Sequence, residues 1–127
     1  MMTDSNMHES HVRILLVEDD QDDYVILRDM LSDVKWWKAD LDWAPTYHEA
    51  LEKMRKNPYS IYIFDYRLGE RDGLELLEET ASGNCEAPVI LLTGQGDHEV
   101  DMQAMRSGAS DYLVKDELST GLLERSI

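Results

Sequence analysis

Acidic, hydroxyl and basic side chains stand at the ends of four apolar runs in the sequence. Glu18 and Asp19 follow the first run, Asp65 ends the second, Thr93 ends the third and Lys115 follows the last. In an open parallel sheet, residues in these positions gather beyond the carboxyl ends of the strands, where ligands bind. Three carboxylates a few Å apart would repel by roughly 4 kcal/mol per close pair at an effective dielectric of 20. The acidic set therefore requires a cation.

The residue types in this set indicate phosphoryl chemistry. Mg²⁺ favours anionic oxygen ligands and binds through one or two carboxylates while it keeps waters and accepts a phosphoryl oxygen. A metal would also keep Asp65 ionised, which a carboxylate nucleophile needs. Lys115 and the Thr93 hydroxyl would supply positive charge and a hydrogen bond to a phosphoryl group in transfer. The set predicts a site for phosphorylating Asp65.

The apolar runs have the composition of strands buried on both faces. In the stretch IYIFD, the residues before Asp65 are β-formers without polar alternation, as in a parallel sheet covered by helices. Apolar residues at helical spacing follow each run. The pattern predicts an α/β fold, a doubly wound (βα)5 domain with a five-stranded parallel sheet. The strands are expected at residues 12–17, 39–44, 61–65, 87–93 and 110–114.

Capping signals indicate where the intervening helices begin and end. Thr46 begins a capping box for the second helix, Asp97 is expected to cap the fourth, and Gly108 suits the left-handed position that follows it. Only about residues 118–127 remain for the fifth helix, which is marginal without packing. We therefore expect the last helix to be truncated.

The composition excludes some classes of function. The chain has 12 Lys and Arg against 27 Asp and Glu, and its net charge of −15 would repel nucleic acid and anionic membrane surfaces. No leader pattern opens the chain, and no apolar run approaches a membrane span, which takes about 18 residues. We expect a cytoplasmic protein that binds no nucleic acid and no membrane through this segment. Residues 11–127 are expected to be one domain, excised from a longer protein, after a mobile tail at residues 1–10.

Four sequence motifs in order carry a resemblance to a known family. The motifs are ILLVEDD, FDYRLGERDG, ILLTG and DYLVKDEL, and they hold the site residues described above. Over about residues 12–127 the chain resembles the response-regulator receiver domain of two-component signalling. The resemblance implies a flavodoxin-like fold with strand order 2-1-3-4-5. It also implies a signalling domain that catalyses only its own phosphorylation and dephosphorylation.

The resemblance assigns roles to individual residues. Asp19 would bind Mg²⁺, or Mn²⁺, directly, while Glu18 would act mainly through water. Asp65 would be the phosphoacceptor and a metal ligand. The remaining roles are a metal ligand from the backbone carbonyl of Arg67, phosphoryl contacts from Thr93 and Lys115, a switch aromatic in Tyr112, and control of the phosphoryl lifetime by Arg67 and Gln95.

The resemblance also implies partners. A histidine kinase or a histidine phosphotransfer protein would donate the phosphoryl group. Thr93 would then move toward it, and Tyr112 would rotate inward and change the face formed by the fourth helix, the fifth strand and the fifth helix. That face could support a homodimer, and an output domain is expected on the same longer chain.

Some positions leave alternatives open. Receivers commonly have a cis proline after the site lysine, but Asp116 follows Lys115, so the peptide bond could be trans and the lysine placed differently. Asp20, Asp22 and Asp23 fit a helix start, and for Asp20 a role in the site is equally plausible. Trp36, Trp37 and Trp43 are expected to cap a core, with a contact surface as the alternative.

Three other functions are alternatives to the receiver. A flavodoxin-like FMN binder needs hydroxyls and amides in its first loop, whereas EDDQDD presents acids. A haloacid-dehalogenase-type phosphatase needs a second acid two residues after its nucleophile, where Arg67 stands. The third rival is an interaction module of receiver shape that is never phosphorylated, and the sequence does not eliminate it.

Overall fold

The structure is a computed structural model, and it describes residues 11–69, 71–82, 87–94 and 98–127. Its main sheet has five parallel strands in the order β2-β1-β3-β6-β7, which confirms the predicted order 2-1-3-4-5. The expected tail at residues 1–10 lies outside the described residues. The strands are β1 (His11–Val17), β2 (Lys38–Ala44), β3 (Ile61–Asp65), β6 (Val89–Thr93) and β7 (Asp111–Val114).

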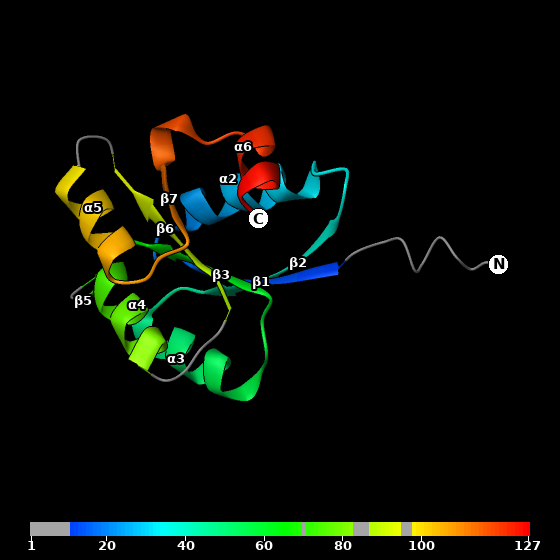
Figure 1. Ribbon diagram of the computed structural model, residues 1–127. Coiled ribbons are helices and arrows are strands. Elements are labelled where there is room, and N and C mark those ends of the chain that lie inside the picture. The colour runs from blue at the N-terminus through cyan, green and yellow to red at the C-terminus, as the bar shows by residue number, and fades with distance from the viewer. Residues whose placement is uncertain (1–10, 70, 83–86, 95–97) are drawn as a thin grey trace.

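Helices cover both faces of this sheet (Figure 1). One layer consists of α2 (Gln21–Ser32) and α6 (Thr120–Ser126), and the other of α3 (Tyr47–Lys56), α4 (Gly73–Ser82) and α5 (His98–Arg106). None of the described helices is both long and apolar enough to cross a bilayer. The seven residues of α6 agree with the expected short last helix.

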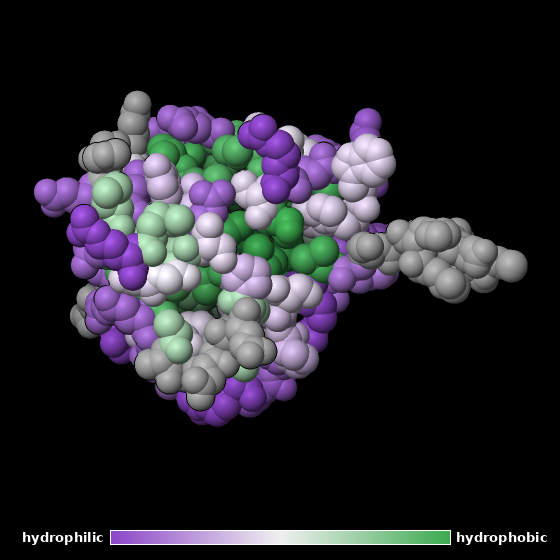
Figure 2. Space-filling model, viewed as in Figure 1, coloured by the Kyte–Doolittle hydropathy of each residue, from purple (hydrophilic) through white to green (hydrophobic). Residues whose placement is uncertain are grey.

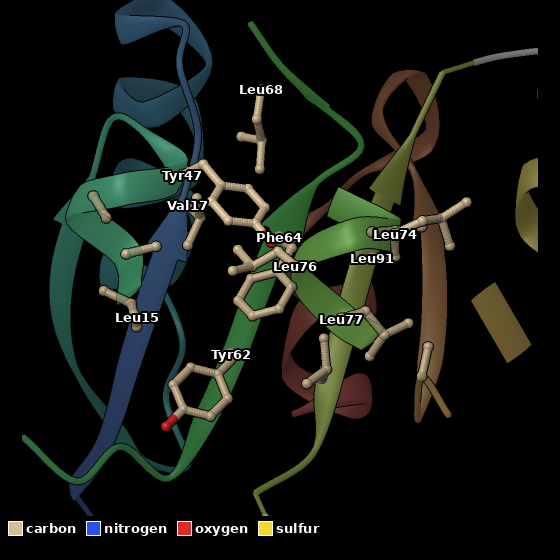
Figure 3. Close-up of a cluster of buried hydrophobic side chains, with 14 of the residues drawn as sticks. Leu15, Val17, Tyr47, Tyr62, Phe64, Leu68, Leu74, Leu76, Leu77 and Leu91 are labelled. Carbon is tan, nitrogen blue, oxygen red and sulfur yellow. The ribbon is translucent and has the colours of Figure 1, made fainter. Parts of the chain in front are cut away.

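Alternate residues of each central strand enter two separate cores. Ile14 and Leu16 of β1 pack in the core under α2 and α6, while Leu15 and Val17 pack in the core under α3, α4 and α5. Figure 3 shows the second core, where Phe64 lies among leucines of α4 and β6. Burial of one such side chain contributes about 1.5–3 kcal/mol. Figure 2 shows apolar side chains along the seam between the helix layers and hydrophilic ones over the outer surfaces.

The helix ends follow the predicted capping chemistry where the structure describes them. The Thr46 hydroxyl accepts a hydrogen bond from the Glu49 amide at 3.1 Å, which confirms the first half of the capping box. Gly108 ends α5 with φ +106°, and the Ala109 amide after it donates to the Ala104 carbonyl at 3.0 Å. The expected cap at Asp97 lies outside the described residues.

Two features of the fold differ from the predicted elements. β6 begins at Val89 and not at residue 87, since Pro88 has no amide hydrogen and only its carbonyl joins the ladder, through the Tyr62 amide. A small antiparallel pair, β4 (Arg67–Leu68) and β5 (Arg71–Asp72), follows β3 and was not predicted. Gly69, at φ +72°, supplies the left-handed residue beside this pair.

A polar contact between β2 and α3 should make the stability of this corner depend on pH. Burial alone would raise the pKa of Asp42, but hydrogen bonds from the Tyr59 hydroxyl and from Lys53, the latter 2.9 Å away, lower it. A carboxyl whose pKa is lowered in the folded state stabilises the protein above its unfolded pKa, about 3.9, and loses that contribution as pH falls through the folded pKa. The destabilisation caused by Asp42→Asn should therefore shrink below about pH 4.

Urea unfolding of the parent and the variant between neutral and acidic pH would measure this difference. Tyr59→Phe removes only the hydroxyl donor and should reproduce part of the loss at neutral pH. A difference between parent and Asp42→Asn that stayed constant with pH would contradict the assignment.

Candidate functional site

The carboxyl ends of β1 and β3 bring three acids together. Val17 pairs with Phe64 in the parallel register, so Glu18 and Asp65 follow at the same edge of the sheet. Glu18, Asp19 and Asp65 each offer a carboxylate oxygen, and these oxygens all lie within 4.8 Å of one another. Glu18 and Asp65 are buried, while Asp19 is exposed. The acidic cluster therefore opens to solvent on the side of Asp19.

The cluster fits a small, hard cation. Mg–O bonds measure 2.0–2.1 Å, so two oxygens on opposite sides of an octahedral Mg²⁺ lie about 4.2 Å apart. The separations in the cluster reach 4.8 Å at most, so an inward shift of less than about 1 Å would bring one oxygen from each acid onto a single ion. The predicted grouping of Glu18, Asp19 and Asp65 is confirmed, and the identity of the ion stays a prediction.

Lys115 reaches into the same cluster from the far side. It begins a short 3₁₀ helix, η1 (Lys115–Glu117), directly after β7. Its Nζ lies 3.0 Å from Asp65 Oδ2 and 3.0 Å from Glu18 Oε1. The contact with Glu18 is an ion pair, because its angles do not suit a hydrogen bond. The peptide bond to Asp116 is trans, yet the ammonium still meets Asp65.

Burial and neighbouring charges shift the pKa values of both Glu18 and Lys115. Burial of the Glu18 carboxyl away from water is the main cause that raises its pKa to about 9, and the neighbouring Asp65 is the second. Lys115 offsets only part of this increase. Burial would lower the pKa of Lys115, but the hydrogen bond to Asp23 and the nearby carboxylates of Glu18 and Asp65 raise it well above its ordinary value. Lys115 is therefore a permanent cation, while the cluster keeps an excess of acid.

An aromatic pair supports the loop that carries Glu18. The Trp43 indole Nε1 on β2 donates to the Glu18 carbonyl at 2.7 Å, which fixes the backbone where the strand ends. The Tyr24 ring of α2 stacks on Trp43 with centroids 4.2 Å apart and planes 6° from parallel. The first turn of α2 and the end of β2 thus hold the acidic loop between them.

Comparison with known proteins identifies the family. The sequence profile of the response regulator receiver domain matches residues 14–126. The chain belongs to this family. It is a receiver domain of the response regulators of two-component signalling, and the predicted resemblance is confirmed.

Curated relatives of this receiver domain are longer proteins. The chain is 34% identical over 109 residues to the transcriptional regulatory protein ZraR of Klebsiella oxytoca, covering 86% of this chain and 24% of that protein. It is also 34% identical over 116 residues to the C4-dicarboxylate transport transcriptional regulatory protein DctD of Pseudomonas aeruginosa, covering 91% and 24%. The chain thus spans about a quarter of the length of these relatives.

Solved structures share the fold over nearly the whole domain. A response regulator from Chloroflexus aurantiacus superposes with a TM-score of 0.82 at 27% identity, covering 91% of this chain and 94% of that one. A CheY-like receiver domain protein from Methanospirillum hungatei gives 0.77 at 28% identity, covering 91% and 90%. The five-stranded parallel fold of this receiver domain is therefore that of the family.

Thr93 ends β6 beside the acidic cluster. Its side chain is fully buried, and its hydroxyl oxygen has no hydrogen-bond partner among the described residues. In the register, Thr93 lies opposite Val114, the residue before Lys115, and Asp65 lies opposite Leu92. A buried hydroxyl with an unused hydrogen-bonding capacity suits contact with an incoming oxygen.

The remaining predicted site residues lie at different distances from the cluster. Tyr112 of β7 is partly buried against the core under α3, α4 and α5, as expected for a core-facing aromatic. The Arg67 amide lies 3.4 Å from Asp65 Oδ1, a long contact, and the Arg67 side chain is exposed. Gln95 lies outside the described residues. The roles of these three residues stay predictions.

The structure adds Asp23 to the site, although the sequence had suggested only that this acid belongs to the start of a helix. Asp23, in the first turn of α2, places Oδ2 2.7 Å from Lys115 Nζ, closer than Asp65 or Glu18. Its position five residues after Glu18, in the turn that faces the strand ends, could have suggested this contact. Asp20, by contrast, caps α2 through a 2.9 Å hydrogen bond from the Asp22 amide to its Oδ1.

A glycine behind Asp65 is required by close packing. A Cβ at Gly73 would clash with the Asp65 carbonyl oxygen and lie 2.8 Å from Leu91 Cδ1. Gly73→Ala is expected to lower the free energy of unfolding by about 1–3 kcal/mol, since the backbone at Asp65 would have to shift. Chemical denaturation would measure the loss.

Gly121 provides the matched control for this substitution. A Cβ at Gly121 in α6 meets nothing within 4 Å, so Gly121→Ala should be neutral or stabilising by up to about 1 kcal/mol. Equal stability of the Gly73→Ala protein and the parent would show that the contact with Asp65 relaxes freely.

Proposed function

We propose that this receiver domain is a phosphoacceptor whose Asp65 takes a phosphoryl group in a Mg²⁺-dependent reaction. The observation that carries the proposal is the meeting of Lys115 and the acidic cluster at the buried Asp65 carboxylate, with the buried Thr93 hydroxyl, which has no partner among the described residues, at the end of the neighbouring strand. A cluster with this excess of acid is costly unless a cation joins it. Phosphorylation of Asp65 gives both the metal and Lys115 a phosphoryl oxygen to bind.

The transfer is a displacement at phosphorus. A carboxylate oxygen of Asp65 forms a bond to phosphorus while the bond to the donor breaks, which is a P–N bond in a phosphohistidine and a P–O bond in acetyl phosphate. The departing imidazole nitrogen keeps the electron pair and takes up a proton. Bound Mg²⁺ would offset charge on the phosphoryl oxygens, with Asp19, Asp65, the Arg67 carbonyl and, through water, Glu18 as its ligands.

The other residues act on the phosphoryl group once it is attached. Lys115 holds a positive charge 3.0 Å from the Asp65 oxygen, so it stays within reach of an equatorial phosphoryl oxygen. The Thr93 hydroxyl would donate to another, and Tyr112 would follow its movement. Water later attacks phosphorus and restores the Asp65 carboxylate and free phosphate, at a rate set in part by Arg67 and Gln95.

The partners follow from the same reaction. We propose a histidine kinase or a histidine phosphotransfer protein as the donor, and an output domain on a longer chain as the recipient of the signal. The curated relatives are transcriptional regulators about four times the length of the aligned segment, which supports an attached output. The face formed by α5, β7 and α6 would change on phosphorylation and could pair with a second copy. A cytoplasmic location is proposed from the chemistry of these donors.

Intact mass spectrometry tests the proposed function. The chain is incubated with Mg²⁺ and acetyl phosphate, and one added phosphoryl group is expected, which hydroxylamine should remove because it cleaves acyl phosphates. Chelation of the metal with EDTA should prevent the gain. A chain that gains no mass under these conditions would instead support the rival, a receiver-shaped interaction module that is not phosphorylated.

A further inference from the structure

A pocket lies where the end of α2 meets the beginning of β2. It has a volume of about 430 Å³, within the range of known binding pockets. Lys38 begins β2 and pairs with His11, the first residue of β1, so this end of β2 lies at the amino edge of the sheet. The acidic cluster lies at the opposite, carboxyl edge. The pocket is therefore separate from the proposed phosphoryl site.

The charge of the pocket is opposite to that of the protein. Arg28, Lys35 and Lys38 line it, and no Asp or Glu does, although the chain as a whole carries 27 acids and 12 bases. The ammonium groups of Lys35 and Lys38 form no ion pair within the described part of the chain. Arg28 pairs with its neighbour Asp29 at 3.3 Å on the surface and lies over the Tyr24 ring. The two ammonium groups thus offer positive charge that no ion pair among the described residues neutralises.

An aromatic side chain stands beside these cations. Trp36 lines the pocket and is 80% exposed, so the expected role of core cap is wrong for Trp36, while Trp37 and Trp43 are partly buried. The cause is visible in the backbone: the amides of Lys35 and Trp36 both donate to Glu124 Oε2 at 3.2 Å. A carboxylate of α6 therefore holds the loop in the conformation that exposes the indole.

We infer that this corner is a docking surface for an extended acidic segment of a partner protein, with one bulky apolar side chain seated in the pocket beside Trp36. Tryptophan and arginine are enriched among the residues that carry binding energy at interfaces. The three cations come from α2, the following loop and β2, a spread that suits an extended segment with several carboxylates. β2 is also the end strand of the described sheet, where an extended segment can lie alongside.

The charge distribution favours this occupant over a second copy of the chain. Two copies would each carry a net charge of −15 and repel outside the corner. A short acidic segment would meet three cations and the exposed Trp36 ring together at this corner, and it brings little other charge to be repelled by the acidic remainder of the surface. The inference does not rest on the proposed phosphorylation of Asp65.

Selection from a displayed random-peptide library tests the inference with the chain as it is. Enriched peptides are expected to carry Asp or Glu on both sides of an aromatic or large aliphatic residue, and to bind more weakly as salt increases. Trp36→Ala should weaken their binding at least tenfold, as should the double variant Lys35→Glu with Lys38→Glu. Lys56→Glu with Arg106→Glu makes the same charge change on exposed helix ends elsewhere and should leave binding within about twofold.

Three outcomes would overturn the inference. The first is a library that yields no binder, and the second is a set of binders that keep their affinity for the Trp36 and Lys35/Lys38 variants. The third is a concentration-dependent dimer, seen by analytical ultracentrifugation, that Trp36→Ala disperses, because the corner would then serve contact between copies.

Discussion

Asp65→Asn is expected to abolish phosphorylation of the chain by acetyl phosphate. The amide is a poor nucleophile and carries no charge, so neither bond formation to phosphorus nor a strong metal contact is available. Mg²⁺ binding should weaken by tenfold or more, since one of three anionic ligands is lost. Intact mass after incubation gives the first result, and calorimetric titration with Mg²⁺ gives the second.

The loss should occur in a folded protein. Lys115 retains Asp23 and Glu18 at 2.7 and 3.0 Å when Asp65 loses its charge, and repulsion between the carboxylates decreases. The free energy of unfolding should therefore stay equal to that of the parent or rise. Asp72→Asn is the matched control, because Asp72 lies in β5, seven positions after Asp65, and accepts from the Glu75 amide at 2.9 Å, a bond that asparagine also makes. Labelling of Asp65→Asn to the extent of the parent would place the acceptor elsewhere.

The parts of the site that the sequence predicts are those determined by strand ends. Glu18, Asp65, Thr93 and Lys115 each follow or end a buried strand, and parallel strands place their carboxyl ends on one edge of the sheet. Burial of alternate apolar residues fixes the register, so these residues converge without any knowledge of loops. The strand order, by contrast, is predicted from the resemblance to the receiver family.

The parts that the sequence leaves open depend on contacts between distant segments. Asp23 meets Lys115 across 92 positions of the chain, and an acid in a first helical turn is already explained by the helix dipole. Trp36 is exposed because Glu124, 88 positions away, binds its backbone. In each case the local pattern has a sufficient local explanation, and a tertiary contact decides the outcome.

Lys115→Gln is expected to slow phosphorylation by about 100-fold or more, because the charge that faces the phosphoryl oxygens disappears. The same change should strengthen Mg²⁺ binding by about tenfold, or roughly 1.4 kcal/mol, since the ammonium lies 3.0 Å from both Glu18 and Asp65 and competes with the ion for them. Rates from time-resolved mass spectrometry and affinities from calorimetry would separate these opposite effects. Weaker binding of Mg²⁺ to the variant would show that Lys115 supports the metal site and does not compete with it.

Metal should also replace the lysine as a source of stability. Without Mg²⁺, Lys115→Gln leaves Glu18, Asp23 and Asp65 without their shared cation, and unfolding should become easier by up to about 3 kcal/mol. Protonation of Glu18, whose pKa is already raised to about 9, limits this loss. Mg²⁺ at 100 times its dissociation constant for Lys115→Gln would restore about 2.7 kcal/mol of the free energy of unfolding of this variant.

Lys53→Gln provides the control, because it breaks a 2.9 Å ion pair with Asp42 outside the site. At one fixed concentration, Mg²⁺ should stabilise Lys53→Gln no more than the parent, whereas it should stabilise Lys115→Gln more than the parent. This excess is expected only where metal and lysine neutralise the same carboxylates.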